Sequence, residues 1–168
     1  LMAKGHKSNM SNEDYINFNK IKPIQIKENV KHFFDSSDTK NALGFGWSFS
    51  FRKGIWTEGN ELNILFAFQP NEKKEYNVRL KISSSIADIN KYLSGSVKFN
   101  GKKIKNFKFK NFENSSDTFI EFLIPITDIN NELYKVDIIV DNPISPLSLL
   151  RSADGRMLGI LIESIEII

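Results

Sequence analysis

Two tryptophans nine residues apart are the most distinctive chemical groups in the sequence, and Trp47 and Trp56 flank a basic turn formed by Arg52, Lys53 and Gly54. An exposed indole offers a flat face on which the apolar side of a sugar ring can stack, and the basic turn could bind an acidic sugar or a phosphate. However, a tryptophan in an alternating strand more often packs in a sandwich core, and a basic hairpin tip is usually a solvated turn. The pattern leaves both interpretations open and favours the core.

A second candidate site lies in the late segment 141–167. Arg151, Asp154 and Arg156 could together form a polar ligand site at the rim of the domain. The structural alternative is an ion pair between Asp154 and Arg156, with an Asx-type turn that fixes the loop before the last strand. The structural alternative is slightly favoured.

The sequence offers little for metal or cofactor chemistry. It has no cysteine and only two histidines, His6 and His32, which excludes thiolate zinc sites, cysteine nucleophiles and multi-histidine centres. Asp141 and Asn142 could give oxygens to a structural calcium ion, but two oxygens fall short of the roughly six to eight that calcium takes. We expect no cofactor.

Paired carboxylates are the remaining route to catalysis, because two acids in one cleft can hydrolyse a glycosidic bond. The candidates are Glu58, Glu61, Asp141 and Asp154. No nucleophile-elbow, zinc-protease, phosphate-loop or dinucleotide motif accompanies them. We therefore expect a chain that is not itself an enzyme, with a small glycan-active enzyme as the least favoured alternative.

The composition predicts one folded domain without covalent or metal staples. The chain has 168 residues, 14 of them Phe, and 26% are charged, which suffices for one hydrophobic core. The net charge of +3 combines 23 basic with 20 acidic residues. This balance argues against a general nucleic-acid or membrane binder, and no apolar run approaches the roughly 20 residues of a membrane span.

The chain is expected to divide into a leader and one domain. Residues 1–20 are predicted to be a flexible leader or a cloning remnant, because a polar terminus without packing residues is seldom ordered. Residues 21–168 are predicted to form a single β-sandwich domain. Leu1 precedes Met2, and we expect a fragment of a longer protein whose catalytic part lies elsewhere.

Short β-branched and aromatic runs separated by Gly, Asn, Ser, Asp and Pro are typical of antiparallel sheets. We predict about nine strands in a two-sheet antiparallel β-sandwich of jelly-roll type. The expected strands lie in 24–34, 47–51, 62–68, 76–82, 97–99, 104–109, 119–124, 136–140 and 158–168. One or two short connecting helices are predicted among 86–93, 127–133 and 147–152.

Lysines crowd the strand that contains Phe107 and Phe109. They could resemble a nucleic-acid-binding strip, but a strand with one apolar face and one lysine face explains them more simply, and lysine-rich edges also deter aggregation. The lysines concerned are Lys102, Lys103, Lys105, Lys108 and Lys110.

Two segments resemble a known family. The segments LGFGWSFSFRKGIWTEG (43–59) and DNPISPLSLLRSADGRMLGILIESIEI (141–167) are similar to paired segments of accessory β-sandwich domains, of jelly-roll or galactose-binding-like type, in bacterial surface-polysaccharide glycosyltransferases and related enzymes. The chain departs from that pattern in lacking an acidic residue between the tryptophans and in placing Gly155 between Asp154 and Arg156. The matching residues are Gly46, Trp47, Gly54, Trp56, Ser145, Pro146, Leu147, Ser152, Asp154, Arg156, Leu158, Gly159, Ile160 and Ile165.

The resemblance implies a noncatalytic accessory domain of a bacterial surface-glycan biosynthesis enzyme. Its expected partners are a glycan or lipid-linked glycan, bound weakly, and the catalytic domain of a parent enzyme. The implied location is cytoplasmic, at the inner face of the membrane through that parent. A structural or protein-docking module is the alternative.

Overall fold

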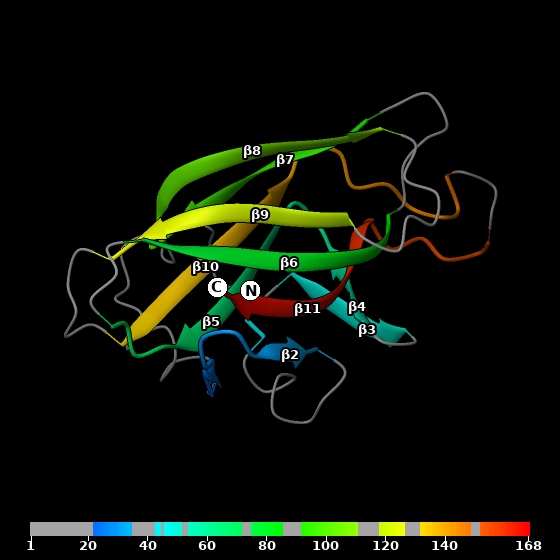
Figure 1. The fold of residues 1–168 in the computed structure, drawn as a ribbon. Coiled ribbons are helices and arrows are strands. Elements are labelled where there is room, and N and C mark those ends of the chain that lie inside the picture. Colours follow the sequence, from blue (N-terminus) through cyan, green and yellow to red (C-terminus); the bar gives the residue numbers. More distant parts are fainter. Residues whose placement is uncertain are drawn as a thin grey trace.

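A computed structural model describes residues 22–34, 43–44, 46–51, 54–71, 75–85, 92–110, 118–126, 132–148 and 152–168. These residues form two packed β-sheets, as Figure 1 shows. No helix occurs in these ranges, and accordingly no helix there could cross a bilayer. The predicted two-sheet sandwich of jelly-roll type is confirmed.

The first sheet, sheet A, has five strands. Its spatial order is β1-β5-β10-β7-β8, and all neighbours pair antiparallel except β1 with β5. Strand β7 is therefore internal, and β8 forms one edge. The bounds are β1 Ile24–Gln25, β5 Glu61–Ala67, β10 Leu133–Val140, β7 Tyr92–Phe99 and β8 Lys102–Lys110.

The second sheet, sheet B, is built around the last strand of the chain. Its main order is β3-β4-β11-β6-β9, and β2 also pairs with β11. Strands β4 and β2 occupy successive parts of the same side of β11. The bounds are β2 Lys31–Phe33, β3 Trp47–Phe51, β4 Gly54–Glu58, β6 Glu75–Ser85, β9 Thr118–Pro125 and β11 Leu158–Ile167.

The strand count exceeds the prediction at two places. The segment 24–34 divides into β1 and β2, because the chain turns at Asn29, whose φ is 62°. The tryptophan segment forms two strands, β3 and β4, instead of one. Strands β7 and β8 are joined by a tight turn at Asn100 and Gly101, since both residues have positive φ, as the Asn-Gly dipeptide readily allows.

The predicted helices are not found where the structure describes the chain. Tyr92 begins β7 and Leu133 begins β10, so both predicted helices would have run into strands. Residues 147–148 form a turn. Residues 86–91, 127–131 and 149–151 lie outside the described residues, as does the predicted leader.

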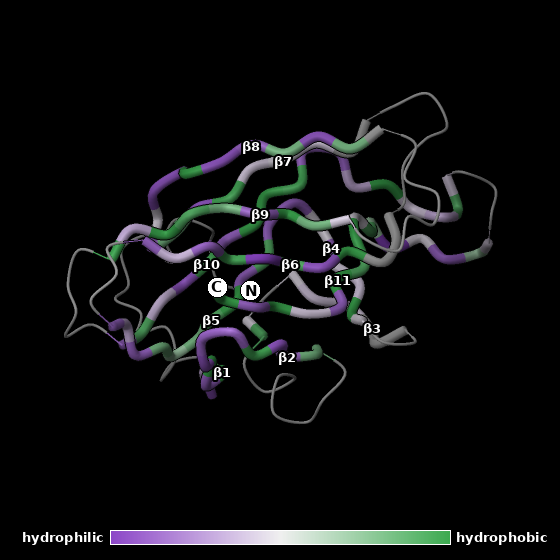
Figure 2. Tube along the Cα trace, in the orientation of Figure 1, coloured by the Kyte–Doolittle hydropathy of each residue, from purple (hydrophilic) through white to green (hydrophobic). Residues whose placement is uncertain are grey.

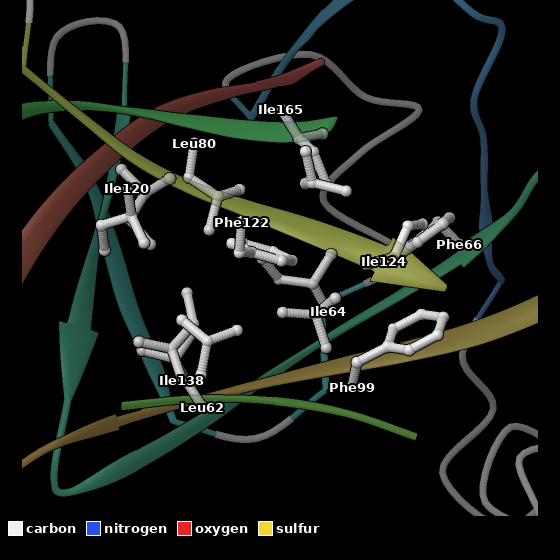
Figure 3. Close-up of a cluster of buried hydrophobic side chains, with 14 of the residues drawn as sticks. Leu62, Ile64, Phe66, Leu80, Phe99, Ile120, Phe122, Ile124, Ile138 and Ile165 are labelled. Carbon is white, nitrogen blue, oxygen red and sulfur yellow. The ribbon is translucent and has the colours of Figure 1, made fainter. Parts of the chain in front are cut away.

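The core lies between the two sheets, where alternate side chains of each strand meet. Figure 3 shows Ile64 and Phe66 of β5 facing Phe122 and Ile124 of β9, with Leu80 of β6 beside them. Residues 62–66 are all buried. Strand β5 is therefore covered on both of its faces along this stretch.

Ile64 gives a test of this packing, because its side chain is fully buried at the centre of the cluster. Replacing Ile64 by Ala should lower the free energy of unfolding by about 2–5 kcal/mol, through lost apolar burial and the cavity left behind. Leu123→Ala is the control, since Leu123 is 56% exposed and its truncation should change stability by less than about 0.5 kcal/mol. Urea denaturation followed by circular dichroism measures both, and equal losses would contradict the assigned core.

Candidate functional site

The two tryptophans lie on opposite faces of the β3–β4 hairpin. Trp47 is paired with Thr57, so Trp56, which precedes Thr57, points to the other side of the sheet. Trp47 packs against the main core, with its ring centroid 5.4 Å from that of Phe34. Its indole N–H donates a 2.7 Å hydrogen bond to the carbonyl oxygen of Asn63.

Trp56 belongs to a smaller cluster on the outer side of sheet B. It lies opposite Leu161 and packs with Leu158 and Ile144, and only 8% of its surface is exposed. A ring buried to this extent offers no free face to a sugar. The core interpretation is therefore confirmed for Trp56, and the exposed-platform alternative is corrected there.

Two glycines of the family resemblance are required by close contacts. Gly46 has a φ of +86°, and a Cβ there would lie 2.1 Å from the carbonyl oxygen of Glu61. A Cβ on Gly159 would lie 2.7 Å from the Thr57 hydroxyl, which accepts a 3.0 Å hydrogen bond from the Ile160 amide. Both glycines therefore shape the hairpin and the start of β11.

The connection before β11 forms backbone hydrogen bonds to that strand and between its own residues. We call residues 141–157 the rim loop (Figure 1, orange), of which 149–151 lie outside the described residues. Ile144 and Leu158 form an antiparallel bridge through two hydrogen bonds, and the Leu147 amide donates to the carbonyl oxygen of Asp154 at 2.8 Å. The rim loop thus covers Trp56 with Ile144 and holds Asp154 in place.

Asp154 and Arg156 form a two-pronged ion pair. The Arg156 Nε donates to Asp154 Oδ1 at 2.9 Å, and Nη2 donates to Oδ2 at 2.7 Å. The Arg156 backbone amide also donates to Oδ1 at 3.0 Å, which closes an Asx turn. The predicted ion pair and Asx turn are confirmed.

The Asp154–Arg156 ion pair also contacts the β3–β4 hairpin, and its carboxylate remains ionised in acid. Arg156 Nη1 donates to the hydroxyl of Ser48 on β3 at 3.2 Å. The hydrogen bonds from Arg156 lower the pKa of Asp154 to about 2, because they favour its charged form. In turn, the hydrogen bond to Asp154 and the charges of Asp154 and Glu58 raise the pKa of Arg156.

Two predicted site residues, Arg52 and Arg151, lie outside the described residues, as does Lys53. The weak calcium candidates have protein partners: Asp141 Oδ2 accepts a 2.9 Å hydrogen bond from the Ser94 hydroxyl, and Asn142 Oδ1 accepts one from the Ser94 amide at 3.3 Å. Among the described residues, no three His, Cys, Asp or Glu side chains gather as metal ligands would.

Two of the four candidate acids, Asp141 and Asp154, lie in the rim loop, and the other two lie on strands. Glu58 ends β4 beside Leu158, where its charge acts on Arg156. Glu61 begins β5 and faces the outer side of sheet A, where its charge acts on Asp137. The structure therefore relates Glu61 to an acid that sequence reasoning did not select.

Asp137 is the buried acid on the outer face of sheet A. It lies opposite Asn63, whose side-chain N–H₂ donates to Asp137 Oδ1, and Lys135 Nζ lies 3.7 Å from Oδ2. Burial is the largest influence and raises the pKa of Asp137, whereas Lys135 and Asn63 lower it. An Asn and an Asp inside otherwise apolar runs are the sequence signal that could have located this cluster.

No protein-family model matches the chain, and no curated protein matches it. Solved structures similar to it include an acetyl xylan esterase from the rumen bacterium Butyrivibrio proteoclasticus (11% identity, TM-score 0.47, 82% of this chain and 32% of that one). Another is a Bacillus thuringiensis Cry1Da tryptic core variant (16% identity, TM-score 0.48, 82% of this chain and 23% of that one). A third is a carbohydrate-binding module CBM36 in complex with calcium and xylotriose (13% identity, TM-score 0.40, 83% of this chain and 99% of that one).

The chain spans 32% of the length of the acetyl xylan esterase and 23% of that of the Cry1Da variant, and it spans 14% of a further similar structure, a family GH115 4-O-methyl-α-glucuronidase. The assignment to a β-sandwich rests on the strand pairing described above.

The tryptophan environments predict a fluorescence result. In a Trp47→Phe variant, emission comes from Trp56 alone, and iodide should quench it several-fold less than free tryptophan because the ring is 8% exposed. A Stern–Volmer titration measures this. Quenching equal to that of free tryptophan would contradict the packing of the rim loop over Trp56.

The raised pKa of Asp137 predicts a pH-dependent stability difference. The folded state holds the Asp137 proton more tightly than the unfolded state, so the contribution of Asp137 to the free energy of unfolding falls as pH rises above about 4. The free energy of unfolding of Asp137→Asn minus that of the original protein should therefore rise between pH 4 and pH 7. Asp141→Asn, which removes an exposed carboxylate, is the control in urea titrations, and a flat difference for Asp137→Asn would contradict the assignment.

Proposed function

We propose that this chain is a noncatalytic accessory domain that binds carbohydrate weakly at the rim loop. The observation that carries the proposal is the Arg156 guanidinium, which is held by Asp154 and Ser48 at a partly exposed position. A planar guanidinium has several donors in a fixed geometry, and the carboxylate beside it is an acceptor. A sugar edge with neighbouring hydroxyls offers the complementary acceptors and donors.

Apolar side chains next to this pair support the same proposal. Leu147 and Met157 are 51% and 45% exposed. Met157 follows Arg156 directly, and the Leu147 amide is bound to the Asp154 carbonyl. Exposed apolar residues beside polar groups are typical of interaction sites, and a pyranose ring presents an apolar C–H face beside its hydroxyl edge.

The open form of the rim predicts weak binding. Ligand pockets that bind small molecules tightly bury most of the ligand, whereas the Asp154 and Arg156 side chains stand at an exposed loop. We expect dissociation constants of about 0.1–10 mM for a short oligosaccharide. Arg52 and Arg151 belong to the same two segments as the rim site and are proposed as further contacts.

The biological setting is part of the proposal. The resemblance of segments 43–59 and 141–167 to accessory domains supports a bacterial surface-glycan biosynthesis enzyme as the parent, with a glycan or lipid-linked glycan as ligand. The proposed location is the cytoplasm, at the inner face of the membrane through that parent. Docking to the parent's catalytic domain is the second candidate, and the exposed Leu147 and Met157 favour it as well.

The rim site predicts a residue-specific loss of glycan binding. Arg156→Gln should weaken binding of a neutral oligosaccharide about tenfold or more, since it removes charge-assisted donors. Arg79→Gln is the matched control, because Arg79 also pairs with a carboxylate, Glu121, at 2.6 Å but lies on β6. NMR titration of both variants measures the effect.

Binding should also stay constant between about pH 4 and pH 8, since the pKa of Asp154 is about 2. Two results would refute carbohydrate binding at the rim: no saccharide response at millimolar concentrations, or equal losses in Arg156→Gln and Arg79→Gln. Saturable binding of an isolated catalytic domain of the parent, lost in Leu147→Ala, would support docking instead.

A further inference from the structure

The outer face of sheet A is basic on its β7–β8 side. Lys98 lies opposite Lys103 in the strand register, Ser96 opposite Asn106, and Ser94 opposite Lys108. Each opposed pair shares one face of the sheet. That face points away from the core, because Val97 and Phe99, the neighbours of Lys98, are buried inside it.

We call these six residues the lysine face. Lys103, Asn106 and Lys108 are exposed, whereas Ser94, Ser96 and Lys98 are half-buried. Figure 2 shows purple, hydrophilic segments along β8. Polar groups thus form an array across two strands, and lysine stands at both ends of it.

The opposition of Lys98 and Lys103 works against folding. Like charges directly opposite each other on neighbouring strands destabilise a sheet. Neither ammonium has an ion-pair partner in the described part of the chain. Asp137 lies opposite Lys98 on the next strand; its oxygens contact Asn63 and Lys135, and the Lys98 charge also lowers its pKa. Asp137 therefore offsets part of the repulsion at Lys98, but it lies two strands away from Lys103.

Protection of a sheet edge does not explain Lys98. Lysines on an edge strand prevent pairing with other molecules, and this accounts for Lys102 and Lys105 on β8. Lys98 lies on β7, which is paired on both sides, with β10 and β8. An anion bound over the pair would offset the repulsion that the fold otherwise bears.

We propose that the lysine face binds an acidic glycan, whose carboxylate or phosphate groups contact Lys98, Lys103 and Lys108 while its hydroxyls bond to Ser94, Ser96 and Asn106. The spacing of the charges supports a glycan. Lys98 lies four positions along β7 from Ser94, the partner of Lys108, so the two basic ends lie about 13 Å apart. Hydroxyl and amide groups fill the interval, where they can bond to the hydroxyls of the sugar units between the two contacted acidic groups.

Nucleic acid fits this surface less well. Sequence-tolerant binding of single strands uses aromatic side chains for base stacking. None of the six residues of the lysine face is aromatic. The two rings in the groove beside β8 already have contacts within the protein, Phe109 with Phe107 and Phe119 with the Arg79 guanidinium.

A groove beside β8 would let a longer chain continue around the edge. It lies between β8 and β9, encloses about 490 Å³, and includes Asn106 and Lys108 of the lysine face in its lining. Lys105 adds a further positive charge there, and Phe109 and Phe119 give apolar surface. The acid Glu121 also lines the groove, where its carboxylate is paired with Arg79 at 2.6 Å. The groove therefore continues the same combination of charge, hydrogen-bonding groups and apolar contact.

This inference rests on the proposed function only in taking the ligand to be a glycan, since the two sites belong to different sheets. The test uses the full chain and polygalacturonate, with neutral dextran as the uncharged comparison. Affinity electrophoresis at about 20 mM salt should show retention by polygalacturonate, and about 0.3 M salt should weaken it because the charges are screened.

The Lys98→Gln/Lys103→Gln variant should bind polygalacturonate about five- to tenfold more weakly, as expected for the loss of two charge contacts. Its Tm should stay close to that of the original protein, because the lost repulsion between the two lysines is offset by the lost attraction between Lys98 and Asp137. Lys27→Gln/Lys31→Gln is the matched control, with the same change of charge at exposed positions before and in β2, and should bind within twofold of the original.

Arg156→Gln should keep its retention by polygalacturonate, so failure at the rim and failure at the lysine face remain distinguishable. Three results would overturn the proposal: no retention by polygalacturonate at low salt, equal weakening in the two double-lysine variants, or tighter binding of oligothymidylate than of polygalacturonate. The last of these would identify the surface as a nucleic-acid site.

Discussion

Burial of β11 on both faces is the constraint on which the rest of the structure depends. Every residue from Leu158 to Ile165 is buried, and the strand pairs with β2, β4 and β6. Ile160 and Ile162 enter the main core, whereas Leu161 packs against Trp56 on the other face. One strand therefore holds together the core, the smaller tryptophan cluster and the start of the rim loop.

A bulge of one residue in β11 allows side chains from both halves of the strand to enter the core. Ile162 pairs with Ile82 and Ser164 with Lys81, which leaves Glu163 without a register partner on β6. Such a bulge shifts the side-chain alternation by one, so Ile165 and Ile167 return to the core. The carboxylate of Glu163 lies 3.6 Å from Lys81 Nζ, and this contact compensates its burial.

Alternation along the chain carries the part of the fold that could be predicted. It located Val78, Leu80 and Ile82 on one buried face, and it placed Leu161 opposite Ile160 and Ile162, as the structure has them. Local chemistry was equally informative at the Asx turn before β11, because an Asp two residues before an amide can close that turn alone.

Strand register was the information that the sequence lacked. Whether Trp47 and Trp56 share a face depends on which residue pairs with Trp47. The sequence does not give this pairing, because the register of the hairpin is set by its turn and its bulge. The outer face of sheet A was missed for a related reason. Asn63 stands out as a polar residue in the apolar run 62–66, but without the strand register the sequence does not show that its side chain meets Asp137 across the sheet.

The residues that carry the family resemblance are chiefly structural in this chain. Gly46 and Gly159 allow close backbone approach, Trp56 and Leu158 fill the smaller cluster, and Ile160 and Ile165 fill the core. Such residues preserve the position of the hairpin and rim loop and do not themselves select a ligand. Under the two proposals, ligand choice falls to exposed residues such as Arg156 and to the lysine face, which a motif of structural residues does not describe.

Two weak surfaces on one rigid sandwich have a consequence for binding. A polymer that contacts the rim loop and the lysine face together would bind the second at a high effective concentration, provided that its length spans the two sheets. Attachment to a catalytic domain that holds the same polymer adds a further linked contact. Under the two proposals, individually weak and exposed sites would therefore suffice, because linkage between them supplies the affinity that each site lacks.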